Sequence, residues 1–200
     1  MKTLSGSALT AAGLLVLPGT AHAHLVNSGL GPFYDGALHL LISPDDLLVI
    51  LALALLAALR GPRAGRLTVL SLPAAWLLGG LAGLAMFPAA APGWLGVVSF
   101  LVVGILVAAD ARLSAAAIAA LAAACGAVHG LLNGAALAAV DAGIPGLMGI
   151  VLTALVLTLL VAGAAVPLRA MRARIALRVA GSWIGAVGLL MLGWLFQGAA

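Results

Sequence analysis

The chain has 200 residues, of which 65% are hydrophobic and 7% are charged, and its formal net charge is +4. A soluble domain usually carries about 25% charged residues, so this composition excludes an ordinary soluble domain and indicates a protein embedded in a lipid bilayer. The sequence lacks the alternation of polar and apolar residues that β-barrel strands require. The net positive charge does not indicate nucleic-acid binding, because the arginines lie in short gaps between apolar runs. We therefore predict an all-α, polytopic membrane protein.

The first 23 residues have the pattern of a secretory signal peptide. Lys2 precedes a short apolar core over residues 8–17, and Ala21-His22-Ala23 is a cleavage motif of the A-x-A type. Cleavage after Ala23 would leave a mature domain of residues 24–200 that begins with His24 on the outer side of the membrane. The α-amine and imidazole of an N-terminal histidine can chelate one metal ion together. The alternatives are an uncleaved first helix, and a His24 that merely follows the cleavage site.

Six apolar segments follow a polar connector, with proline and glycine in the breaks between them. Most approach the roughly 20 residues that are needed to cross about 30 Å of hydrocarbon. We predict transmembrane helices over Asp45–Leu59, Leu67–Met86, Trp94–Ala109, Ser114–Val140, Ile144–Val166 and Val179–Phe196.

The distribution of charge predicts the orientation of these six segments. Every arginine lies in one of three alternate gaps, at 60–66, 110–113 and 167–178, whereas the other gaps contain Asp35 and Asp141. Arginine and lysine accumulate in cytoplasmic loops, so the three arginine gaps are expected to face the cytoplasm. An even number of spans and a periplasmic mature N-terminus in a bacterial inner membrane follow from this arrangement.

Glycines at intervals of four residues predict where these helices touch. Small residues at this spacing let two helix backbones approach closely in lipid. The spacing occurs at Gly126, Gly130 and Gly134, at Gly79 and Gly83, and at Gly181 and Gly185.

The segment from His39 to Asp46 brings polar residues into an apolar sequence. Ser43, Pro44 and the two acids after them, Asp45 and Asp46, fit the start of a helix, with a capping residue, a proline at the first position and acids near the positive end of the helix dipole. The helix that begins there is short for a full crossing, so the apolar residues before it are expected to enter the membrane as well. The acids would then lie at a broken helix below the membrane surface, where ionisable groups usually mark a pathway or a partner.

A second polar stretch lies in the middle of the fourth segment. His129 and Asn133 are one turn apart and therefore share a helix face. A single histidine that bonds a backbone carbonyl is the simpler explanation for His129 alone. We predict instead that the two polar stretches face each other and form one site, with His39, Asp45, Asp46 and His129 as metal ligands and Asn133 and His24 as further candidates; imidazole with carboxylate suits divalent first-row metals.

The sequence does not predict an enzyme or an organic cofactor. A nucleophile with its base, a phosphate-binding glycine loop after a strand and a soluble substrate domain are all missing from its pattern. The single cysteine, Cys125, is surrounded by apolar residues and is interpreted as a packing residue. The expected surroundings are the lipid bilayer, without nucleic acid.

At its two polar stretches the chain resembles the HupE/UreJ family of small integral membrane proteins. The family pattern H-P-L-x-G-x-D-H is similar to His39-Leu40-Leu41-Ile42-Ser43-Pro44-Asp45-Asp46, in which the last histidine is replaced by Asp46. A later F-H-G-x-A-H-G pattern is similar to Val128-His129-Gly130-Leu131-Leu132-Asn133-Gly134, in which the second histidine is replaced by Asn133. Each motif therefore keeps one histidine and has an oxygen-bearing residue in place of the other.

The resemblance implies a permease for nickel or cobalt that serves hydrogenase or urease maturation, with maturation proteins as partners. Oxygen ligands are harder than imidazole, so the replacements would lower the preference for nickel. Two other functions fit the sequence. One is a membrane accessory that docks maturation proteins through the arginines of 167–178 without transporting metal. The other is a carrier of protons or small solutes that uses the acids and His129.

Overall fold

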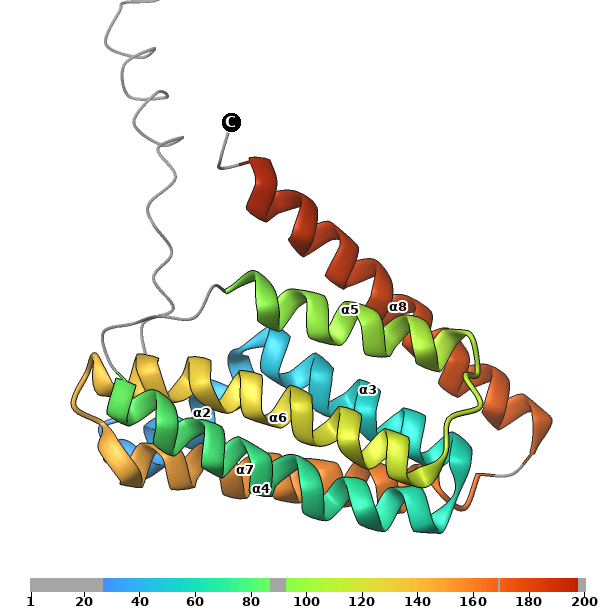
Figure 1. Cartoon of the computed structure of the whole chain (residues 1–200), viewed down its shortest axis with the longest axis horizontal. Coiled ribbons are helices and arrows are strands. Elements are labelled where there is room, and N and C mark those ends of the chain that lie inside the picture. The colour runs from blue at the N-terminus through green and yellow to red at the C-terminus, as the bar shows by residue number, and fades with distance from the viewer. Residues whose placement is uncertain (1–26, 87–92, 169, 198–200) are drawn as a thin grey trace, which may run out of the picture.

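The computed structural model describes residues 27–86, 93–168 and 170–197, and all regular structure in these ranges is helical (Figure 1). The predicted signal peptide, His24 and Arg169 lie outside the described residues. The helices are α2 (Pro32–Ile42), α3 (Pro44–Arg60), α4 (Pro62–Met86), α5 (Trp94–Ala108), α6 (Ala115–Ala138), α7 (Gly143–Ala165) and α8 (Met171–Gln197). The prediction of an all-α fold is confirmed for this part of the chain.

Helix α3 is the centre of the bundle. It contacts each of the other described helices, and its buried residues include Val49, Leu53 and Leu56, all fully buried. Helices α4 and α6 pack along each other, as do α2 and α7, and α5 forms a separate pair with α8 (Figure 1). The α5–α8 pair and the remaining helices thus lie on different sides of α3.

Four of the described helices are long and apolar enough to cross a membrane by themselves, namely α4, α6, α7 and α8. Helices α2 and α3 pass the same test only together, and would add a fifth span. Helix α5 is apolar but has 15 residues, which at 1.5 Å per residue gives about 22 Å. The described helices therefore support a multi-pass membrane protein with four to five spans by this measure, fewer than the six predicted.

The chain bends by 71° between α2 and α3. Ser43 separates the two helices and has an extended backbone, with φ −84° and ψ 107°. Pro44 follows it, and a residue before proline is driven out of the helical region by the proline ring. The predicted cap is only partly correct, because Ser43 occupies the capping position but its hydroxyl donates to the carbonyl of His39, at 2.7 Å, instead of accepting from α3. A broken helix at the acids is present as predicted.

Glycines hold α4 and α6 in backbone contact. A Cβ atom added to Gly79 would clash with the backbone of Ala127, and one added to Gly130 would clash with the backbone of Trp76. Gly134 meets the backbone of Gly80 in the same way. These are glycines that the four-residue spacing singled out, and the close approach fixes the position of α6, which carries His129.

Glycines also bring the backbones of α5 and α8, and of α2 and α7, into close contact. Gly104 of α5 meets α8 at Gly185, where an added Cβ would lie 2.7 Å from the backbone nitrogen. Gly36 of α2 meets the backbone of Gly146 in α7. Helix α3, in contrast, contains no glycine between Pro44 and Arg60 and packs against its neighbours through leucine, valine, isoleucine and alanine side chains.

Two of the predicted arginine gaps are helical, which corrects the predicted boundaries. Helix α4 begins at Pro62 instead of Leu67, and α8 begins at Met171 instead of Val179. Proline suits the first position of a helix and arginine is a good helix former, so charge in these segments does not end the helix. The segment 167–178, predicted as a loop, therefore presents most of its arginines on the first turns of α8.

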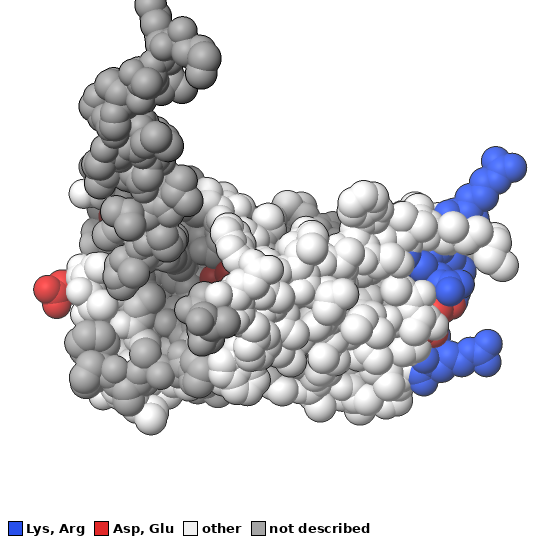
Figure 2. Space-filling model, turned by 90° about the horizontal axis from the view of Figure 1, so that it is seen from above, with Lys and Arg blue, Asp and Glu red and all other residues white. Residues whose placement is uncertain are grey.

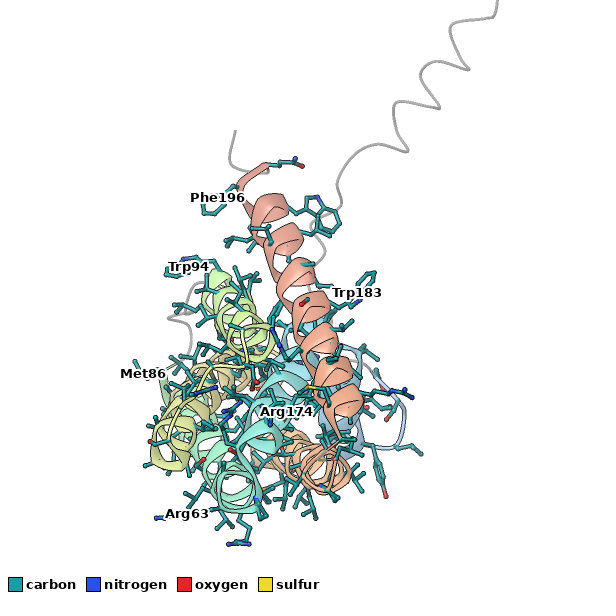
Figure 3. The ribbon with its side chains drawn as sticks, turned by 90° about the vertical axis from the view of Figure 1, so that its right-hand side faces the viewer. Arg63, Met86, Trp94, Arg174, Trp183 and Phe196 are labelled. Atoms are coloured by element: carbon teal, nitrogen blue, oxygen red, sulfur yellow. The ribbon has the colours of Figure 1, made fainter. Side chains whose placement is uncertain are left out.

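The described arginines gather at one end of the bundle, which we call the arginine end (Figure 2). There Asp110, in the turn after α5, accepts hydrogen bonds from Arg60 of α3 and from Arg174 of α8, the latter at 2.6 Å. Arg174 lies near the middle of this end, whereas Arg63 lies at its edge (Figure 3). Asp110 has a positive φ of 52°, which aspartate tolerates better than most residues. This cluster ties three helices together.

Candidate metal centre

The second polar cluster lies where α3 begins, opposite the arginine end. Asp45 and Asp46 occupy the first turn of α3, and α6 contributes His129 and Asn133 from its middle. Because α6 runs antiparallel to α3 beside it, the middle of α6 reaches the level of the helix break. Helix α5 completes the cluster with Ser99.

A chain of hydrogen bonds joins these three helices. His129 Nδ1 lies 2.7 Å from Asp46 Oδ1, and His129 Nε2 lies 2.7 Å from Ser99 Oγ. Both Asp46 and His129 are buried, at 3% and 0% exposure. The ring of Trp76 covers the imidazole, with ring centroids 5.3 Å apart. The imidazole is therefore fixed in position and orientation by partners on both of its nitrogens.

The Ser99 hydroxyl determines which nitrogen of His129 carries hydrogen. Ser99 Oγ lies 2.7 Å from the carbonyl oxygen of Gly96, and only the single hydroxyl proton can make that hydrogen bond. The oxygen therefore accepts from His129, whose Nε2 must carry a hydrogen. One further proton lies between Nδ1 and Asp46 and makes the hydrogen bond that joins them.

Asn133 completes the environment of Asp46. Its amide nitrogen lies 3.1 Å from Asp46 Oδ1, 3.0 Å from Asp46 Oδ2 and 2.8 Å from the His129 carbonyl oxygen. The opposite orientation of the amide would place its oxygen against these acceptors, so the described orientation is the favourable one. The amide oxygen of Asn133 is buried and accepts no hydrogen bond from any residue that the structure describes. A buried acceptor without a partner is costly, and such groups are rare.

Asp45 extends the cluster toward α5. Donor atoms of Asp45, Asp46 and His129 lie within 4.8 Å of one another, which is close enough for one ion to contact all three. A Cβ atom on Gly96 would lie 3.1 Å from Asp45 Oδ2 and 3.6 Å from His129 Cε1. The missing side chain at Gly96 thus leaves the space that the Asp45 carboxylate occupies.

A hollow of about 190 Å³ opens beside the cluster. Water takes about 30 Å³ per molecule in the liquid, so the hollow can hold an ion with several water molecules. His39 lines it from α2, with its Nε2 atom 3.4 Å from Ser43 Oγ, but stays outside the group of donors within 4.8 Å. The residues around the hollow are His39, Ser43, Asp45, Asp46, Gly93, Leu132, Asn133 and Ala136.

The structure brings together the residues that the two polar stretches singled out. Asp45, Asp46, His129 and Asn133 are in one cluster, and His39 is beside it. Sequence reasoning missed Ser99, although it is the one hydroxyl residue in the apolar segment Trp94–Ala108, and polar residues in such segments often have a role. Gly96 carried no signal that would distinguish it from the other glycines of the chain.

The described helices are apolar, and two carboxylates, an imidazole and an amide meet at an internal helix break. This arrangement defines a multi-pass membrane protein with a candidate cation site. Comparison with protein families agrees with this class. The family described as HupE / UreJ protein matches residues 12–191, and the chain belongs to this family. The searches against curated proteins and against solved structures gave no match.

Proposed function

We propose that the protein binds a divalent transition metal ion at the cluster of Asp45, Asp46 and His129 and passes it across the membrane. The observation that carries this proposal is the meeting of three donor atoms within 4.8 Å in a buried position, next to a hollow that can hold water. Imidazole and carboxylate together suit divalent first-row metals. The HupE/UreJ family is associated with nickel and cobalt uptake or with hydrogenase and urease accessory functions, so nickel and cobalt are the first ions to test.

The charges of the cluster support binding of a cation. The proton between His129 and Asp46 compensates one of the two carboxylates. The carboxylate of Asp45 has no arginine beside it, because the described arginines lie at the other end of the bundle (Figure 2). A metal ion would supply the missing positive charge, as it does at other buried carboxylate pairs. We propose no catalytic activity for the protein. Metalloenzyme maturation proteins would receive the ion.

We also propose the orientation in the membrane. The arginine end would face the cytoplasm, and the hollow beside the cluster would face the periplasm of a bacterial cell. Six spans after a cleaved signal peptide remain our proposal for the mature chain, with α5 as the shortest span. A hollow on the periplasmic side would let the ion enter the site before it is passed inward.

Uptake of radioactive nickel and cobalt into cells tests the proposed function. Cells that produce the protein should accumulate more metal than cells that lack it, and the Asp46→Asn variant should lose the difference. Asp110→Asn serves as a matched control, because it removes the same charge at the arginine end. Equal uptake with and without the protein for every divalent metal would reject the proposal.

A further inference from the structure

We propose that the cluster selects an oxygen-preferring divalent cation of the manganese(II) type, with Asp45, Asp46 and Asn133 as its ligands and His129 as a positioning residue behind Asp46. This inference rests on the proposed function and narrows its substrate class. It keeps the position of the ion but replaces His129 by Asn133 in the donor set, whereas direct ligation by His129 is what the sequence predicts and the proposed function assumes.

The side chains that face the hollow are the first observation. Asp45, Asp46 and Asn133 line it, as does His39, whereas His129 is fully buried and is not among the lining residues. An ion that enters the hollow therefore meets the carboxylates and the imidazole of His39, and does not meet the imidazole of His129. Carboxylate, carbonyl and water oxygens suit manganese, magnesium and calcium, and imidazole suits nickel, copper and zinc.

The hydrogen bonds of His129 are the second observation. Nε2 donates to Ser99 Oγ and Nδ1 is bonded to Asp46 Oδ1, so both nitrogens are already in use. To bind a metal directly, the imidazole would have to give up one of these bonds and turn under the ring of Trp76. In its described position it orients the Asp46 carboxylate, as residues behind a metal ligand commonly do.

Asn133 is the third observation and points to a ligand independently. Among the residues that the structure describes, none donates a hydrogen bond to its buried amide oxygen, and the residue is 4% exposed and lines the hollow. The amide nitrogen is held by Asp46 and by the His129 carbonyl, so the oxygen cannot turn to find a donor among these acceptors. A bound cation would give this oxygen the partner that it lacks.

His39 is the imidazole that lines the hollow, and it does not change the donor set of the cluster. It lies outside the group of atoms within 4.8 Å and contacts Ser43 across the helix break. Three oxygen donors together with retained water match the coordination that manganese accepts. The hollow of about 190 Å³ has room for such a partly hydrated ion.

The first test measures manganese(II) and nickel(II) affinities of the purified full chain by equilibrium dialysis. Nickel exceeds manganese at most sites, so the ratio of the two affinities is the quantity to compare. Asn133→His should raise the nickel-to-manganese ratio by about tenfold or more, and Asn133→Asp should lower it by strengthening manganese binding. Asn133→Leu should weaken manganese binding by about tenfold. An unchanged manganese affinity in Asn133→Leu would overturn the role of Asn133.

The second test separates a positioning role of His129 from ligation. Electron paramagnetic resonance of bound manganese(II), with electron spin-echo modulation, reports nitrogen atoms that are bonded to the ion. The nitrogen modulation should be the same in the wild type and in His129→Gln, whose side-chain amide can still donate to Asp46, while His129→Leu should weaken binding by about 10- to 100-fold. A nitrogen signal that disappears in His129→Gln would show direct ligation and overturn the inference.

The outcomes distinguish this inference from the proposed function. If no divalent ion binds, or if Asp46→Asn binds as the wild type does, both fail. If nickel or cobalt binds in an Asp46-dependent way with nitrogen of His129 on the ion, the proposed function stands and the oxygen-based selectivity is wrong. Asp110→Asn should keep the wild-type affinities for both ions, and circular dichroism should show an unchanged helix content for every variant compared.

Discussion

The two ends of the bundle each contain a carboxylate cluster, and the clusters differ in what neutralises them. Asp110 at the arginine end accepts from two permanently charged groups, Arg60 and Arg174. Asp46 accepts from the neutral amide of Asn133 and shares a single proton with the imidazole of His129, and a cation can displace that proton. The first carboxylate is fully compensated by the protein, whereas the second keeps a capacity for a mobile cation.

The partners of each aspartate separate a structural link from a binding site. Both clusters join helices that are far apart in sequence, and both involve an aspartate at a helix end or turn. An aspartate between arginines is a structural link, because its charge is balanced within the fold. An aspartate whose partners are a histidine and an asparagine, beside a hollow of about 190 Å³, has no permanent positive charge to balance it, and this difference marks the site.

We expect the greatest loss of metal binding from a substitution in the cluster at the helix break. Asp46→Asn removes the carboxylate that three hydrogen bonds orient, and we expect metal affinity to fall by about 100-fold, since ligand charge sets the affinity of such sites. Isothermal titration calorimetry of purified protein measures the loss. An affinity within a factor of two of the wild type would show that the ion binds elsewhere.

Acid should weaken metal binding at the cluster of Asp45 and Asp46. The ligand carboxylates must be free of protons to bind metal, so protons compete with the ion and metal affinity should increase with pH, by up to about tenfold per pH unit where one proton is displaced. Binding measured between mildly acidic and neutral pH checks the direction. A metal affinity that does not change over this range would contradict the involvement of these groups.

A methyl group at Gly96 should weaken the site by crowding it. The added Cβ of Gly96→Ala would lie 3.1 Å from Asp45 Oδ2, so the carboxylate must move by a few tenths of an ångström. Binding sites tolerate displacements of about 0.5 Å, so we expect metal affinity to fall by about tenfold or less. Gly193→Ala is the matched control, because nothing lies within 4 Å of its added Cβ. Equal losses in both variants would show that the effect does not come from crowding at the site.

The smallest effect on metal is expected at the arginine end, where the cost should appear in stability. Asp110→Asn weakens the links to Arg60 and Arg174, which are partly exposed, so we expect a loss of about 1 kcal/mol in the free energy of unfolding. For a chain of this size that corresponds to a fall in melting temperature of about 2–4 °C. Thermal unfolding in detergent measures it. A loss of metal binding in this variant would mean that the two ends are coupled.

The helices could be predicted from the sequence because apolar runs and their breaks carry a strong signal. Helices α3, α5, α6 and α7 begin and end within a few residues of their predicted bounds. The starts of α4 and α8 could not be predicted from charge, because arginine continues a helix as readily as it ends a membrane span. The count of spans depends on helix length and tilt, which the apolar pattern does not determine.

The candidate site was predictable in its residues and not in its geometry. Polar side chains in apolar segments are costly, so Asp46 and His129 stood out. Which atom faces which cannot be derived from spacing, and so Ser99 was overlooked and the orientation of Asn133 could not be foreseen. The hydrogen bond from His129 to Ser99 depends on how closely α5 approaches α6, and that depends on tertiary packing.

The fully buried face of α3 has a consequence for the movement of charge. From the helix break to the arginine end, α3 covers about 25 Å at 1.5 Å per residue, and Val49, Leu53 and Leu56 along it are inaccessible to solvent. An ion stripped of water in such a hydrocarbon medium would face a Born penalty of tens of kcal/mol. Conduction along α3 therefore requires its neighbours to separate far enough for a column of water to form beside it.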